Sequence, residues 1–133
     1  MSTTVDAPLA GWGTPSGDIN RLPLTGVSRL PLNIHSNAYE ATRQVKTGPG
    51  VLYGFTVYSS KASAQFIQVH DLTAVPASGA IPAAVFTIGA TANLPVDWVP
   101  GRVFEYGCWI VNSSTGPTYT AGLADCWFDV QFV

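Results

Sequence analysis

The feature that most constrains the fold of this chain is how often glycine and proline interrupt it. Among 133 residues there are 13 Gly and 10 Pro, too many turn-forming residues for a helical bundle. Between them lie short runs in which apolar and polar residues alternate, the pattern of strands with one buried face. A chain of this length fits one domain whose core needs no metal or disulfide. We therefore expect a single all-β domain.

The alternating runs predict about eight strands. Residues 51–58 and 64–71 flank the four-residue turn Ser60–Ser63, which predicts a β-hairpin. Residues 36–46 pair Glu40 with Arg43 at helical spacing, but their alternation favours a strand. Eight strands predict an antiparallel two-sheet sandwich with jelly-roll topology. The expected strands are 36–46, 51–58, 64–71, 80–90, 93–99 (closed by Pro100-Gly101), 102–112, a weak strand at 118–122, and 125–133.

Parity in the strands 102–112 and 125–133 separates a core face from an outer face. If the chain folds back at Gly116-Pro117, one register sets Cys108 opposite Cys126, and another pairs Trp109 with Trp127. In either register we expect free thiols, because a cross-strand disulfide is geometrically awkward and the compartment is expected to be reducing. The residues expected to face the core are Phe104, Tyr106, Cys108, Ile110, Cys126, Phe128, Val130 and Phe132.

The first part of the chain differs from the rest. Residues 1–35 are rich in Gly and Pro and show neither strand nor helix periodicity, yet they are more apolar than a free tail. We expect an extended, irregular N-terminal arm over 1–35 and a β-sandwich domain over 36–133. Whether the arm orders against its own domain, its own oligomer or another partner is left open.

Charge is scarce throughout the chain. Charged residues make up 11% of it and the net charge is −2, against about 25% charged residues in an ordinary soluble domain. The chain thus lacks the basic surface that nucleic acid or an anionic membrane requires. It also lacks an apolar run of about 20 residues and the features of a signal peptide. We expect synthesis in a cytoplasm and a surface that lies largely against other protein.

No motif predicts chemistry. A Ser-His-Asp site could be assembled from His70, Asp71 and Ser59 or Ser60, but no strand–turn–helix elbow surrounds these serines. The two histidines and two cysteines lack the spacing of a metal site. We therefore expect no enzymatic activity, no catalytic residue, no metal and no cofactor.

Tryptophan is the remaining candidate for binding. Packing in the core or in subunit contacts is the favoured role of Trp12, Trp98, Trp109 and Trp127. Trp109 and Trp127 fall on the faces opposite the expected core, so they either lie under a second layer or mark a binding surface.

Three stretches carry a family resemblance: Gly48–Ser60, Ala64–Asp71 and Asp125–Val133. Together they resemble the small head decoration, or cement, proteins of tailed bacteriophages, over about residues 45–133. The resemblance implies a jelly-roll body with an N-terminal arm, often in trimers. Such proteins lie on the outside of the capsid and bind neighbouring shell subunits. It assigns no functional residue to this chain.

The function we expect is that of a bacteriophage virion structural protein: a capsid decoration protein that binds the outer surface of the head and stabilises the shell. Its expected partners are the major capsid protein and itself, as a homotrimer, without nucleic acid or membrane. The residues expected to make these contacts lie in the arm: Trp12, Leu22, Leu24 and Leu30. The alternative is a tail or fibre-associated sandwich that recognises host-surface glycans through Trp98, Trp109 and Tyr119.

Overall fold

The structure, a computed structural model, describes residues 31–133, which form eight strands and no helix. The strands are β2 (Leu32–His35), β3 (Thr42–Thr47), β4 (Gly50–Ser59), β5 (Gln65–His70), β6 (Ala84–Ile88), β7 (Asn93–Phe104), β8 (Gly107–Ser113) and β9 (Cys126–Phe132). The expectation of an all-β chain with eight strands is confirmed.

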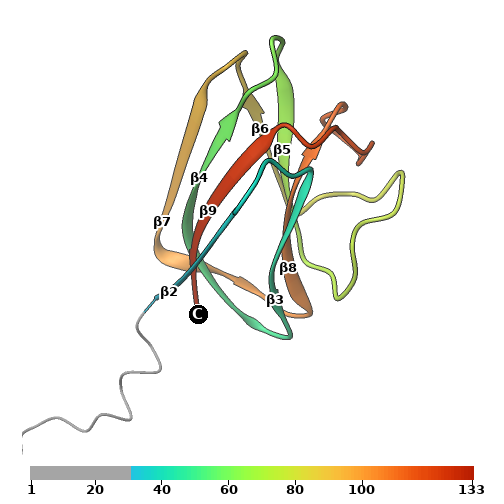
Figure 1. Cartoon of the computed structure of the whole chain (residues 1–133). Helices are drawn as coiled ribbons and strands as arrows, with labels where there is room; N and C mark the ends of the chain where they lie inside the picture. Colours follow the sequence, from blue (N-terminus) through green and yellow to red (C-terminus); the bar gives the residue numbers. More distant parts are fainter. Residues whose placement is uncertain (1–30) are drawn as a thin grey trace, which may run out of the picture. The chain divides into compact units, whose positions relative to one another are not determined.

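The strands form two antiparallel sheets (Figure 1). Sheet 1 has the order β2-β9-β4-β7, and sheet 2 has the order β3-β8-β5-β6. The pairs β2–β9, β3–β8, β4–β7 and β5–β6 are nested within one another. The chain is thus one long hairpin whose outgoing and returning halves are rolled together into two layers, which is a jelly roll. The expected antiparallel jelly-roll sandwich is confirmed.

The core lies between the two sheets and is built from the alternate residues of each strand. In β9, the side chains of Cys126, Phe128, Val130 and Phe132 are buried and those between them are exposed, as parity predicts. Buried residues from both sheets form one cluster: Val45, Leu52, Phe55, Val57, Ile67, Val69, Ile88, Phe104, Cys108, Ile110, Cys126, Phe128, Val130 and Phe132.

Both expected hairpins are wrong. β4 and β5 lie in different sheets, so the turn at Ser60–Ser63 joins the two layers of the sandwich instead of two neighbouring strands. β8 and β9 are also in different sheets, which excludes both registers that would pair Cys108 with Cys126 or Trp109 with Trp127. Alternation fixes which face of a strand is buried, but it does not fix which strand lies alongside. The two cysteines are free, as expected.

The strand expected at 102–112 is divided between two elements. β7 continues through Pro100-Gly101 to Phe104, and the chain turns at Glu105-Tyr106 before β8 begins. Tyr106 therefore lies in the turn and is exposed instead of facing the core. Phe104, Cys108 and Ile110 are buried as expected.

The boundaries of the first and seventh expected strands also change. Strand structure in 36–46 begins only at Thr42, after an isolated bridge between Glu40 and Cys126. The weak strand expected at 118–122 is reduced to a single bridge between Ser113 and Ala121. The eighth strand is instead β2, whose residues were assigned to the arm and which pairs with β9.

Candidate functional site

The arm residues expected to bind partners lie outside the described residues. Trp12, Leu22, Leu24 and Leu30 all precede residue 31, where the described part of the chain begins. The candidate surfaces that can be built from geometry are therefore those of the sandwich.

The residues of the rejected Ser-His-Asp arrangement are engaged elsewhere. His70 is 1% exposed, and its Nε2 donates to Gln68 Oε1 at 2.9 Å. Burial lowers the pKa of His70, which favours the neutral ring. Ser59 Oγ accepts a hydrogen bond from Gln65, and Ser60 Oγ donates to the carbonyl of Asp125. Neither serine hydroxyl contacts the imidazole.

Asp71 has a structural role at the β7–β8 turn. Its carboxylate accepts the backbone N–H groups of Glu105 at 2.9 Å, Tyr106 at 2.8 Å and Gly107 at 3.3 Å. Desolvation alone would raise the pKa of Asp71, but these three hydrogen bonds outweigh it and the pKa is lowered. The carboxylate is thus held ionised as the cap of a turn.

The three residues expected to bind glycans are packed against the protein. Trp98 is half-buried and its ring centroid lies 5.9 Å from that of Phe55. Tyr119 is 5% exposed and meets His70 edge-on. Trp109 is also half-buried, and its indole nitrogen is buried without an acceptor among residues 31–133. None of the three side chains is among the exposed residues of the described chain.

The described residues offer little room for a small molecule. A pocket of about 120 Å³ opens between the sheets beside Val69, Asp71, Arg102 and Val103, whereas small-molecule sites typically occupy about 300–1,000 Å³. Within residues 31–133, no three His, Cys, Asp or Glu side chains converge as a metal site would require. No helix in this part of the chain has the length and apolarity to cross a membrane.

Exposed apolar side chains are frequent on β6, on β7 and in the segment that leads into β6. β6 and β7 are the outer strands of their sheets, and they meet where Arg102 donates to the carbonyl of Ala83 at 2.8 Å. Residues 72–96, which include β6 and the segment leading into it, contain no charged residue. We call β6, β7 and the segment 72–83 together the β6–β7 side. Its residues account for six of the eleven exposed large hydrophobic residues among those described: Leu72, Val75, Ile81, Val85, Val99 and Val103.

A second candidate surface holds an exposed aromatic pair. Trp127 projects from the outer face of sheet 1, and Tyr39 comes from the loop between β2 and β3. Their ring centroids lie 5.9 Å apart and their planes are at 84°, an edge-to-face arrangement. Tyr39 is 49% exposed and Trp127 is 39% exposed. We call this pair the aromatic corner.

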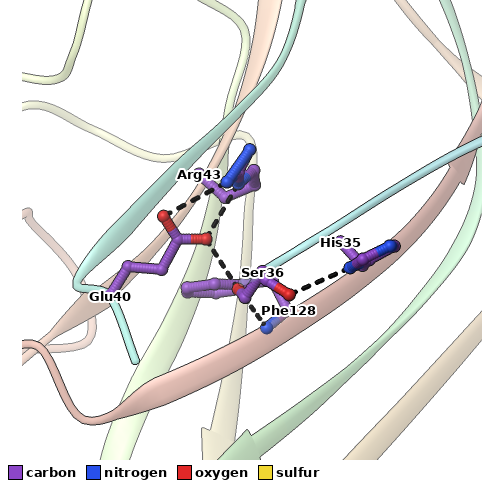
Figure 2. Close-up of polar contacts among 5 residues, drawn as sticks. All are labelled: His35, Ser36, Glu40, Arg43 and Phe128. Carbon is purple, nitrogen blue, oxygen red and sulfur yellow. Dashed lines mark hydrogen bonds and ion pairs between the residues drawn. The ribbon is translucent and has the colours of Figure 1, made fainter. Parts of the chain in front are cut away.

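A partly buried polar network holds the loop that carries Tyr39. Ser36 Oγ accepts the backbone N–H of Phe128 at 2.8 Å and donates to Glu40 Oε2 at 2.6 Å. Arg43 Nε donates to the same carboxylate oxygen at 2.8 Å (Figure 2). The backbone of Glu40 also exchanges two hydrogen bonds with Cys126. The loop is thus fixed to β9 on both sides of Trp127, which determines where Tyr39 lies.

Sequence reasoning identified one member of this pair and missed the other. Trp127 is expected on the outer face by parity, and the structure places it there. The alternating polarity of its neighbours predicts a strand at Tyr39, which lies in a loop instead. Its partner lies in the last strand, and nothing local in the sequence signals so distant a contact.

Comparison of the chain with protein-family models, with curated proteins and with solved structures finds no match in any of the three. The function must therefore be argued from the surfaces of the sandwich.

Proposed function

We propose that this chain is a bacteriophage virion structural protein that decorates the outside of the capsid. In this role it binds the major capsid protein as a homotrimer and stabilises the shell. The β6–β7 side carries the argument, because six exposed apolar side chains lie on or beside a stretch of 25 uncharged residues, 72–96. Apolar surface with little charge favours burial against protein, and Asp97 and Arg102 are the charged residues of β6, β7 and the segment between them.

Decoration also suits the chemistry of the described residues. Each contact of a decoration protein can be weak, because many copies and several contacts per copy add up to tight attachment. The side chains of the Ser-His-Asp arrangement are engaged within the fold, His70 with Gln68 and Asp71 with the β7–β8 turn. The arm residues Trp12, Leu22, Leu24 and Leu30 are proposed as further contacts with the shell or with neighbouring copies.

Immunogold labelling of intact particles with an antibody to this chain tests the proposal. Decoration predicts gold distributed over the head. Gold confined to the tail or its tip would contradict decoration and favour a tail or fibre module that recognises the host surface. If particles bind no antibody although the same antibody detects the purified chain, the chain is not part of the virion surface and the proposal is wrong.

A further inference from the structure

The outer face of sheet 1 combines the aromatic corner with rows of hydrogen-bonding side chains. Because paired residues point to the same side of a sheet, the register identifies what lies on this face. Trp127 is paired with Tyr58, and Tyr58 is paired with Asn93. The next row contains His35, Asp129, Thr56 and Pro95, and a third contains Asn33, Gln131, Gly54 and Asp97.

These rows present hydrogen-bonding groups to solvent beside an apolar platform. Asn33, Asp129 and Gln131 are exposed, and Asn33 Nδ2 donates to Asp129 Oδ1 at 2.5 Å. That bond orients both side chains and leaves the second carboxylate oxygen and the Asn33 carbonyl free to accept further hydrogen bonds. The combination of apolar ring and adjacent amide and carboxylate acceptors is complementary to a pyranose, which has an apolar C–H face and hydroxyl groups at its rim.

The charge of the face selects among sugars. Two carboxylates, Asp97 and Asp129, lie on it, and no Lys or Arg is among the side chains that the register of sheet 1 places there. An acidic sugar would be repelled by these carboxylates, whereas a neutral one would use them as acceptors.

We propose that the aromatic corner and the polar rows beside it form a binding site for neutral glycans, with a pyranose ring packed against Trp127 and its hydroxyls bonded to Asp129 and Gln131. The site is preformed, because the network of Ser36, Glu40 and Arg43 holds the loop that carries Tyr39. The residues assigned to the sugar, Trp127, Asp129 and Gln131, are not residues of the β6–β7 side, so either proposal can fail without the other.

Saturation-transfer NMR with the full chain tests this site. The probes are maltohexaose, cellohexaose and mannohexaose, with a galacturonic acid hexamer as the acidic comparison. We expect saturable binding of at least one neutral hexamer, with transfer strongest to ring protons, and at least tenfold weaker binding of the acidic one. Absence of binding by all three neutral hexamers, or stronger binding of the acidic hexamer, would overturn the proposal.

Substitutions locate the site on the protein. Trp127→Ala should raise the Kd of the bound hexamer at least tenfold. Tyr39→Ala should weaken binding less, because the Trp127 ring against which the pyranose packs is still present. Tyr39 lies in a loop and is half exposed, so its variant is informative even if Trp127→Ala folds poorly. Tyr106→Ala is the matched control, because Tyr106 is 60% exposed and lies in the turn after β7. Equal loss of affinity in the control, or none in the other two variants, would place the glycan elsewhere.

Discussion

At the scale of single residues, the two thiols show how burial controls reactivity. Cys108 lies in sheet 2 and Cys126 in sheet 1, and neither side chain is exposed. Burial and the nearby charge of Asp71 raise the pKa of Cys108 to about 12. Burial and the adjacent Asp125 likewise raise the pKa of Cys126 to about 12. Both thiols are therefore protonated in the folded protein at neutral pH, and only the thiolate is a nucleophile.

We expect neither cysteine to react with a thiol-specific disulfide reagent at about pH 8 while the protein is folded. After unfolding in urea, both should react quickly and in a stoichiometry of two per chain. Because the folded pKa lies above the unfolded one, stability should also fall as the pH rises past the unfolded value. Rapid modification of the folded protein would contradict the burial of these groups. A count of zero after unfolding would reveal a disulfide.

At the scale of elements, the β7–β8 turn depends on one side chain from outside it. Asp71 follows β5, yet its carboxylate supplies acceptors for three consecutive backbone N–H groups of the turn. We expect Asp71→Asn to lower the free energy of unfolding by about 1 kcal/mol at neutral pH, since an exposed ionic hydrogen bond has a modest net value. Urea denaturation measures this difference.

The pH dependence of that difference distinguishes a charge effect from a packing effect. The folded pKa of Asp71 is below its ordinary value, so its contribution is present above about pH 4 and is lost as the pH falls through the folded pKa. The two proteins should therefore converge in stability under acid. Asp97→Asn is the control, because Asp97 is exposed and accepts no hydrogen bond within residues 31–133. A difference that persists unchanged at low pH would show that the charge is not responsible.

A comparison of β9 with the end of β7 shows which features of the fold local sequence patterns predict. Alternation in β9 identifies each buried side chain, because the period of a strand relates sequence directly to faces. The end of β7 could not be placed, since Pro100-Gly101 has the composition of a turn and yet lies within the strand. The true turn at Glu105-Tyr106 has no glycine or proline, and its cap comes from a residue more than thirty positions earlier.

Local sequence patterns also do not predict which of the two sheets a strand joins. The four-residue connection at Ser60–Ser63 is compatible with a hairpin and also with a crossing between layers. What decides between them is the burial of β4 between β9 and β7, which is a property of the complete sandwich. The aromatic corner follows the same rule, because its two rings come from opposite ends of the described chain.

At the scale of the whole molecule, the proposed decoration of a capsid predicts that the β6–β7 side is the attachment surface. A double variant, Ile81→Glu with Val103→Glu, places charge on two of its most exposed apolar positions, 82% and 71% exposed. We expect the free energy of unfolding to change by no more than about 0.5 kcal/mol. Purified particles should lose most copies of the protein, because a buried unpaired charge is costly at an interface. Quantitative gel analysis of particles gives the copy number.

Leu32→Glu provides the matched control for that experiment. Leu32 is 57% exposed and lies in β2, at the opposite edge of sheet 1 from β7. Particles with this variant should keep the same copy number of the protein as particles with the unchanged chain. Normal occupancy by the double variant would show that the β6–β7 side is not the attachment surface.

The nested strand pairs have a consequence for how the protein is made. β9 lies between β2 and β4 in sheet 1, and Leu32 is paired with Phe132, one hundred positions later. Until the ribosome has released residues 126–132, β2 has no neighbour and β4 exposes an unpaired edge to solvent. Sheet 1 therefore cannot be completed strand by strand during translation. We expect this late pairing to be slow, as is typical of strands distant in sequence. Until it is complete, the unpaired edge of β4 can pair with another copy of the chain.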